Sequence, residues 1–254
     1  MILKTQATPL RIRGYSNTSH IVTWLSPEAG RLTTVVKGAC RPKSAFLGQY
    51  DLFYTCELLY YARERDGLHI ARECTPLEFR ASLRYDWRAM LCAAYTCDVL
   101  DHVAENSPPG GSLYALLQVM LDRLANEGAG QPLLLWFEAR LLSVLGLAPD
   151  LAGCPKCHDG TNGELRFAVA DGRLICTHCN TGDRRSAGVT VSRSAVASLR
   201  DAGTRPVPAA QTFAAFSDHE LLALRRFLGI FMRYHLDMPF ESRGIAWGLW
   251  TPSV

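Results

Sequence analysis

The sequence predicts an α+β protein in which a small five-stranded β-barrel precedes a helical region that carries a four-cysteine zinc finger. Three observations predict this fold class. Short β-type runs fill the chain up to about residue 76, apolar residues recur at helical spacing after it, and two C-x-x-C pairs lie between residues 154 and 179. The expected domains are residues 1–76 and residues 77–254, with the zinc-binding insertion at 154–179.

The barrel is predicted from strand-like runs that turn residues separate. The runs are Leu10–Arg13, His20–Leu25, Arg31–Lys37, Phe53–Tyr61 and Leu68–Ala71. Ser26–Gly30 reads as the turn between the second and third runs, and Asp66-Gly67 as a hairpin turn between the last two. Five short strands within about 70 residues favour a barrel of the OB type, although their spacing does not fix the topology.

Helices are predicted from apolar residues that recur every three or four positions. The three series are Trp87, Met90, Ala94, Cys97 and Leu100; Leu113, Leu117, Met120 and Leu124; and Leu134, Phe137, Leu141 and Leu145. Proline and glycine at 107–111 and 128–132 separate these helices. A further helix is expected near Ser192. Another follows Ser217, which has capping-box spacing to Glu220, and ends before Pro239.

Four cysteines have the spacing of a closed metal site. Cys154, Cys157, Cys176 and Cys179 form the pattern C-x₂-C-x₁₈-C-x₂-C. With two residues between its cysteines, one turn can supply two thiolate ligands to a tetrahedral ion. The second turn supplies the other two and completes the coordination sphere. Since four thiolates leave no position for water or substrate, the pattern predicts one structural Zn²⁺.

Two other uses of these cysteines are weaker interpretations. Cys154-Pro-Lys-Cys157-His158 matches a c-type haem attachment pattern, but haem would leave the second cysteine pair unexplained. Thioredoxin-like chemistry lacks its βαβ setting. His158 and His178 could replace a cysteine ligand. The remaining cysteines show no ligand spacing and are expected to be small buried hydrophobic residues: Cys40, Cys56, Cys74, Cys92 and Cys97.

Positive charge is concentrated at the start of the chain. The net charge is +3, but the first 50 residues carry seven basic side chains against one acidic side chain, Glu28, and so contribute +6. A block of this kind suggests a polyanionic partner. The candidate DNA contacts are Arg11, Arg13, Arg31, Lys37, Arg41 and Lys43. Candidate base-stacking residues are Tyr15, Trp24, Tyr50 and Tyr54, although each is more typical of a barrel core.

Several classes of protein are disfavoured by what the sequence lacks. It has no Walker loop, no G-x-G-x-x-G and no G-x-S-x-G, and His219-Glu220 is not followed by the second histidine of a zinc hydrolase. We therefore expect a protein that is not an enzyme. No apolar run reaches the ~18 residues of a membrane span and no signal peptide is recognisable, so a cytoplasmic, nucleoid-associated location is expected.

Two sequence blocks resemble a known family. Gly30–Ala39, continuing through Arg41–Ser44, is similar to the G-R-x…-K-G-A-R-R-P-x-S stretch of RecO, the bacterial recombination mediator of DNA repair. Trp136–Leu142, followed by Leu145-Gly146, Pro149 and Cys154, is similar to the family's F-E-L-R-L-L-x-x-L-G-x-x-P…C junction. The resemblance extends over nearly the whole chain.

The resemblance implies an OB-fold that binds single- and double-stranded DNA and a helical region with a zinc site. It also implies strand annealing, binding to the C-terminal tail of single-strand-binding protein, and work with RecR to load RecA onto coated strands. This sequence departs from the family pattern at four places: Asn17 and Ser19 replace acidic residues, Cys40 replaces an arginine, and Glu241-Ser242-Arg243 replaces K-S-R. A zinc-ribbon adaptor that binds only proteins and a metal-dependent nuclease remain as alternatives.

Overall fold

The computed structural model describes residues 1–63, 67–109, 111–151, 153–154, 156–157, 165–168, 173–176, 179, 188–204, 217–237 and 241–250. The chain folds into two compact units. The first unit is Met1–Ala129 together with Ser242–Val254, and the second is Gly130–Glu241.

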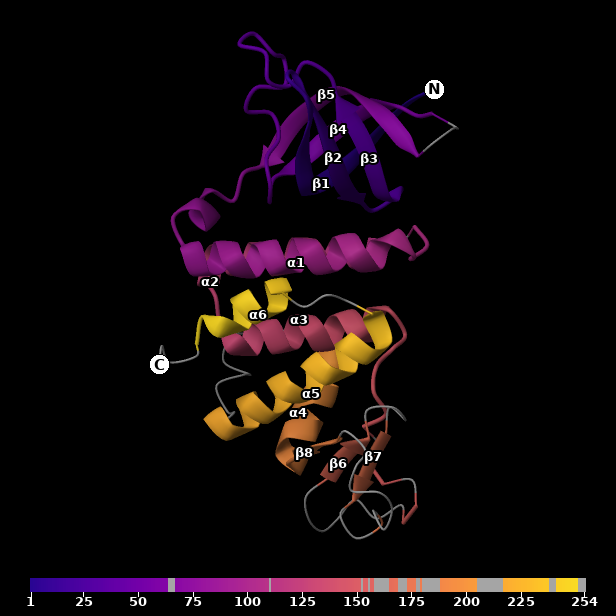
Figure 1. Ribbon diagram of the computed structural model, residues 1–254, viewed down its shortest axis with the longest axis vertical. Coiled ribbons are helices and arrows are strands. Elements are labelled where there is room, and N and C mark those ends of the chain that lie inside the picture. Colours follow the sequence, from indigo (N-terminus) through magenta and orange to yellow (C-terminus); the bar gives the residue numbers. More distant parts are fainter. Residues whose placement is uncertain are drawn as a thin grey trace. The chain divides into compact units, whose positions relative to one another are not determined.

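The first unit begins with a closed five-stranded barrel (Figure 1). Its strands are β1 (Ile2–Ser16), β2 (Ser19–Ser26), β3 (Gly30–Val36), β4 (Thr55–Tyr61) and β5 (Leu68–Glu78). They follow the order β1-β2-β3-β5-β4, in which β3 and β5 are parallel and all other neighbours are antiparallel. The OB-type barrel expected from the strand spacing is therefore confirmed, and the structure supplies its topology.

Two strands are longer than the sequence predicts. β1 begins at Ile2 rather than Leu10, and β5 continues past Ala71 to Glu78, so the expected boundary at residue 76 lies inside β5. Both strands contain a proline beside a register shift, Pro9 in β1 and Pro76 in β5. Proline cannot donate a ladder hydrogen bond, but a bulge removes that requirement. The predicted turn at Asp66-Gly67 lies partly outside the described residues.

The barrel interior forms the hydrophobic core of this unit. Trp24, Val22 and Leu58 are fully buried in it, and the indole nitrogen of Trp24 donates a hydrogen bond of 2.9 Å to Thr34 Oγ1. Burial of large apolar side chains drives folding, and each such side chain contributes roughly 1.5–3 kcal/mol. Partly buried aromatic side chains, among them Phe46 and Tyr50, pack against this core.

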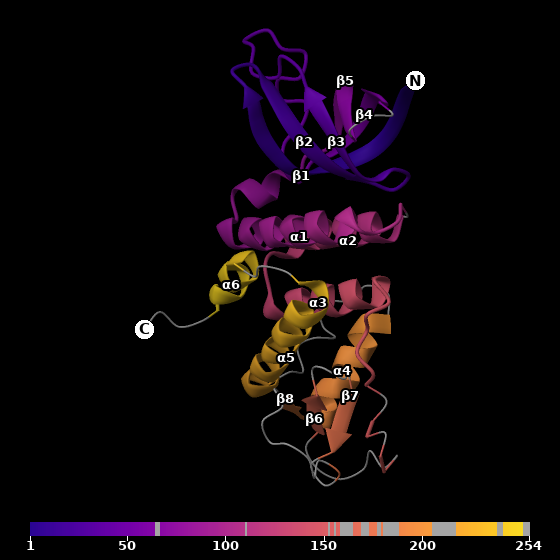
Figure 2. The same cartoon turned by 45° about the vertical axis from the view of Figure 1, so that its right-hand side comes forward.

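The barrel is followed by helices in the first unit. The short 3₁₀ helix η1 (Ala81–Arg84) comes first, and it is followed by α1 (Trp87–Glu105), α2 (Gly111–Glu127) and α6 (Glu241–Gly248). The two long helices are those predicted from apolar spacing. The sequence did not predict α6, in which Ser242 Oγ donates a 2.6 Å hydrogen bond to Asp98 of α1. Both ribbon views show α1 lying across one end of the barrel (Figures 1 and 2).

A buried arginine between β5 and η1 links the barrel to α2. Arg80 has a left-handed backbone with φ of 44°, and its guanidinium donates to Phe53 O, Thr55 Oγ1 and Gln118 Oε1 at 2.8–2.9 Å. It also forms an ion pair of 2.7 Å with Asp122. A buried guanidinium is stable only when its donors are satisfied, so these bonds fix where the helices begin relative to the barrel.

The second unit consists of α3 (Gln131–Val144), the strands β6 (Leu165–Ala168), β7 (Arg173–Cys176) and β8 (Gly188–Val191), and helices α4 (Arg193–Thr204) and α5 (Asp218–Leu236). The strands form an antiparallel sheet in the order β7-β6-β8. The predicted capping box is present, because Ser217 Oγ accepts from the Glu220 amide and the Glu220 carboxylate accepts from the Ser217 amide.

Candidate nucleic-acid interface and metal centre

Four of the six predicted DNA contacts lie exposed toward one end of the barrel. We call Arg13, Lys37, Arg41 and Lys43 the basic cluster. Arg13 pairs with Ile21 near the β1–β2 turn, and Lys37 directly follows Val36, which pairs with His20. Within the part of the chain that the structure describes, no ion pair involves these four side chains, so their charges face solvent.

The loop that carries Lys37, Arg41 and Lys43 is tied to the β1–β2 turn. Gly38 N donates to Ser19 Oγ at 3.2 Å, and Cys40 N donates to Thr18 O at 3.1 Å. Gly38 has a positive φ of 71°, which favours glycine, and the Arg41 side chain lies against the space that a Cβ would occupy there. The loop therefore holds its cations in a defined position near Arg13.

Arg11 and Arg31, the other two predicted DNA contacts, form ion pairs with α1. Arg11 forms ion pairs with Asp98 at 3.3 Å and Asp101 at 2.9 Å, and Arg31 pairs with Asp101 at 2.7 Å. Asp101 is 4% exposed, so these pairs neutralise a buried carboxylate where α1 contacts the barrel. Because Arg31 is the second residue of β3 and pairs there with Asp101 of α1, the loop after Val36 lies roughly 20 Å further along the strand.

The predicted stacking residues separate into two groups. Trp24 is fully buried and Tyr50 packs against the barrel core, so neither presents a free ring face. Tyr15 is 60% exposed at the end of β1. Tyr54 is partly buried beside Phe79, with a centroid distance of 5.0 Å, and the Arg84 guanidinium lies over its ring. Tyr15 is therefore the aromatic candidate that lies close to the basic cluster along the chain.

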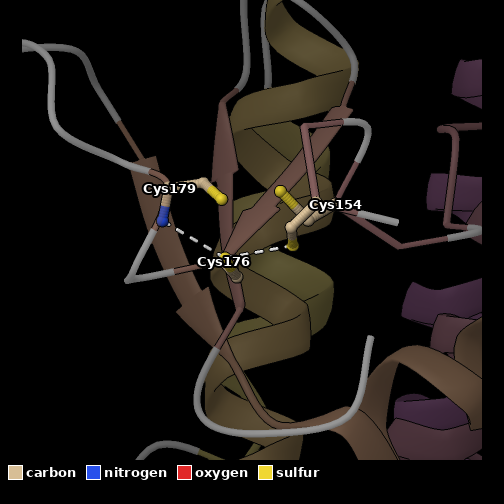
Figure 3. Close-up of side chains that lie close together, drawn as sticks. Cys154, Cys176 and Cys179 are labelled. Atoms are coloured by element: carbon tan, nitrogen blue, oxygen red, sulfur yellow. Dashed lines mark hydrogen bonds between the residues drawn. The ribbon is translucent and has the colours of Figure 1, made fainter. Parts of the chain in front are cut away.

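The four predicted metal ligands lie together in the second unit. The sulfur atoms of Cys154, Cys157, Cys176 and Cys179 are all within 4.8 Å of one another, and the labelled cysteines in Figure 3 converge on one point. Cys157 Sγ and Cys176 Sγ are 3.8 Å apart. A tetrahedral ion with Zn–S bonds of 2.3 Å would separate its sulfur ligands by about 3.8 Å. The geometry can therefore hold a metal ion. His158 and His178 lie outside the described residues.

Backbone hydrogen bonds also suit a thiolate site. Cys179 N donates to Cys176 Sγ at 3.3 Å. Burial opposes ionisation of Cys154, but amide hydrogen bonds from Cys176, Cys157 and Lys156 lower the pKa of its thiol to about 6. Hydrogen bonds shared with Cys176 and Cys157 raise the pKa of Cys179 to about 12. The amide hydrogen bonds therefore favour the thiolate form of Cys154, which is the form that binds a metal ion.

The expectation for the remaining cysteines is correct for four and wrong for one. Cys56, Cys74, Cys92 and Cys97 are buried, but Cys40 is exposed. Cys40 lies in the loop that carries Lys37, Arg41 and Lys43. This loop has few apolar residues that could cover a thiol. The contacts that Asp98 and Asp101 make with Arg11 were not predicted, because no local sequence pattern relates residues almost 90 positions apart.

Comparison with known proteins identifies the family. Residues 1–80 match the family model of the N-terminal part of recombination protein O, and residues 84–244 match that of its C-terminal part. The chain belongs to the RecO family. This family acts in DNA repair and recombination, and the resemblance found in the two sequence blocks is confirmed.

Curated RecO proteins are similar to this chain over most of its length. A DNA repair protein RecO from Syntrophus aciditrophicus is 31% identical over 180 residues, which cover 70% of each chain. One from Alkaliphilus metalliredigens is 30% identical over 75% of this chain and 77% of its own. One from Desulforamulus reducens is 32% identical over 72% and 71%, respectively. Among the described residues, no helix has the length and hydropathy to span a membrane.

Proposed function

We propose that this chain is a recombination mediator that binds single- and double-stranded DNA and anneals complementary strands. With RecR, it helps to load RecA onto strands coated with single-strand-binding protein. The observation that carries the proposal is the basic cluster, four exposed cations on an OB-type barrel in a chain of a DNA repair family. Such barrels bind nucleic acid through basic grooves. Binding of this kind would place the protein at the nucleoid.

The proposed mechanism follows from charge. Two complementary strands repel each other through their phosphates, and cations held on a rigid barrel reduce that repulsion while the bases stay free to pair. We assign Arg13, Lys37, Arg41 and Lys43 to phosphate contact. Arg11 and Arg31 support the site indirectly, because they hold α1 against the barrel. The barrel and the helical region remain the proposed functional domains.

The metal in this proposal is zinc, one ion per chain. Four sulfur ligands with two C-x-x-C pairs suit Zn²⁺, and they leave no open position for a substrate. Its contribution is structural, because it joins the turn before β6 to the turn after β7. No catalytic step is assigned to it.

Annealing of coated strands tests the proposed function. Complementary oligonucleotides saturated with single-strand-binding protein anneal slowly by themselves, and we expect this chain to accelerate annealing at least tenfold through phosphate neutralisation. Duplex formation is followed by fluorescence quenching between end-labelled strands. The same strands with Mg²⁺ or Mn²⁺ should stay intact on a denaturing gel. Annealing at the rate of the coated strands alone would refute the proposed activity, and cleaved strands would favour a nuclease.

We assign the tail of single-strand-binding protein to the helical region. A cavity of about 300 Å³ in the second unit is lined mainly by apolar side chains of α3, α4, α5 and the segment 148–151, and Arg200 also lines it. Asp150 lines the cavity as well as Arg200, so the match to the acidic and apolar tail depends on the apolar lining.

Leu151→Glu tests this assignment. The variant places a carboxylate in the cavity lining, and we expect the affinity for a tail peptide to fall tenfold or more, since the new charge repels the acidic tail and replaces an apolar contact. Leu222→Glu is the matched control, because Leu222 is exposed on α5 and does not line the cavity. Isothermal titration of both variants measures the effect. Equal affinities for the tail in both variants would show that the tail binds elsewhere.

A further inference from the structure

Three polar side chains form a hydrogen-bonded chain on the barrel that the proposed DNA contacts do not use. His20 lies on β2, and its two ring nitrogens have different partners. Nδ1 is 2.7 Å from the Tyr50 hydroxyl, and Nε2 is 3.2 Å from Cys40 Sγ. The ring edges of His20 and Tyr50 meet nearly at right angles. A histidine is thus held between a phenol and an exposed thiol.

The fold holds both partners of His20 in place. The Cys40 amide is bonded to Thr18 O in the β1–β2 turn, which keeps the thiol over β2. The Tyr50 ring packs on Trp24, at a centroid distance of 5.8 Å, and on Phe46 at 6.4 Å. Between these two partners, the imidazole ring presents Nδ1 to the Tyr50 hydroxyl and Nε2 to the Cys40 sulfur.

With either neutral tautomer of His20, Nε2 faces the Cys40 sulfur as a hydrogen-bond partner. If Nδ1–H donates to the Tyr50 oxygen, Nε2 is free to take the thiol proton. If the Tyr50 hydroxyl donates to Nδ1, Nε2–H donates to the sulfur and stabilises its negative charge. After proton transfer, the imidazolium donates to both partners at once. Burial raises the pKa of Tyr50, which keeps its hydroxyl protonated beside the ring.

The other cysteines outside the metal cluster lack these features. Burial raises the pKa of Cys92 and of Cys97 to about 12, so both stay protonated at neutral pH. A hydrogen bond with Cys56, together with burial, raises the pKa of Cys74. Reactive cysteines are accessible and lie beside a base or a cation, whereas buried ones are inert. Cys40 alone among these five combines exposure with a histidine partner.

We propose that Cys40 is a modification site, a nucleophilic thiol that His20 activates and that hydroperoxides oxidise to a sulfenic acid. The thiolate sulfur attacks one oxygen of the peroxide, an S–O bond forms, and the O–O bond breaks. The leaving alkoxide or hydroxide takes the proton from His20 Nε2. The net reaction is Cys–SH + ROOH → Cys–SOH + ROH, in which sulfur loses two electrons and the peroxide gains two.

Oxidation at this position would act on DNA binding, a consequence that rests on the proposed function. Cys40 directly precedes Arg41 and lies in the loop that carries Lys37 and Lys43. A bulky or anionic group on its sulfur would stand among the cations assigned to phosphate contact, and a negative charge there repels phosphate. Oxidation that continues from the sulfenic acid to the anionic sulfinic acid would then weaken DNA binding.

Labelling of the full, metal-loaded chain tests the proposal without DNA. The protein is treated with hydrogen peroxide and dimedone, which captures sulfenic acids, and each cysteine peptide is quantified over time by mass spectrometry. We expect Cys40 to react at least tenfold faster than Cys56, Cys74, Cys92 or Cys97, and His20→Asn to slow it about tenfold. His69→Asn, a change at the other histidine on the barrel strands, should leave the rate of Cys40 unchanged.

Tyr50→Phe keeps the ring packing and removes only the hydroxyl, so it provides a second readout if His20→Asn unfolds. It should slow Cys40 labelling about threefold through loss of ring orientation. Slow labelling of Cys40, or equal rates in wild type and Tyr50→Phe, would overturn the proposal.

Alkylation then separates this proposal from the proposed function. Iodoacetate adds a carboxylate to Cys40 and should lower DNA affinity about fivefold, the equivalent of one lost phosphate contact, whereas neutral iodoacetamide should have a smaller effect. If labelling is fast and depends on His20 but neither reagent changes DNA affinity, the reactive thiol is supported and its effect on DNA binding is rejected. Slow labelling in a protein that binds DNA normally would reject the thiol site alone.

Discussion

Replacement of both Cys154 and Cys176 with serine is expected to abolish stoichiometric zinc binding and to unfold much of the second unit. The strands β6, β7 and β8 have only four residues each, which provides little apolar burial of their own. In small four-cysteine sites the metal-binding free energy, about 10 kcal/mol or more, is free energy of folding. We expect one zinc per wild-type chain and less than about half an equivalent in the double variant, measured by atomic absorption.

The loss should be confined to the second unit. Limited proteolysis of the double variant should cleave after residue 144 first and leave the barrel intact, because the barrel belongs to a separate compact unit. Cys40→Ser is the matched control, since Cys40 lies outside the sulfur cluster and should leave zinc content at one ion per chain. Less than half an equivalent of zinc in fresh wild-type protein, or full zinc in the double variant, would contradict the metal assignment.

Replacement of Lys37, Arg41 and Lys43 with alanine is expected to weaken single-stranded DNA binding about 100-fold in 0.1 M salt. Each phosphate contact releases condensed counterions and contributes about 0.7 to the salt exponent, which is about fivefold per contact at that concentration. The fall should be similar for unrelated sequences, because phosphate contacts carry no base information. Fluorescence anisotropy with labelled oligonucleotides of unrelated sequence measures it.

Two controls accompany the triple variant. Its zinc content and thermal unfolding should match wild type, since exposed loop charges add little stability. Lys4→Ala/Arg72→Ala removes barrel cations that already pair with Glu57 and Glu73, and it should lower DNA affinity much less. A similar loss in this control would mean that net charge, and not the basic cluster, determines binding.

The sequence predicted the elements whose signals are local. The strand runs, the three helices after residue 86, the capping box at Ser217 and the cysteine spacing each depend on residues within a few positions or on one metal-site pattern. It missed the full length of β1 and β5, because proline usually ends a strand and here lies at bulges. It also missed α6, since eight residues are too few for a clear helical period.

The site was predictable in residue type but not in contacts. Six basic residues were singled out, and the structure divides them between an exposed cluster and the pairs that Arg11 and Arg31 form with Asp101. The division depends on where α1 packs against the barrel. No short stretch of the sequence contains that information. In the same way, His20, Cys40 and Tyr50 are 20 to 30 positions apart, and only the barrel brings them together.

Phosphate contact by the basic cluster is measured by the salt dependence of DNA affinity, because the slope counts the phosphates that the protein neutralises. The dissociation constant for one single strand is measured from about 50 to 300 mM salt for wild type and for the variant lacking Lys37, Arg41 and Lys43. We predict that the slope of log affinity against log salt concentration is about two units shallower in the variant. Equal slopes would contradict this prediction and would show that the basic cluster is a solvated surface that contacts no DNA.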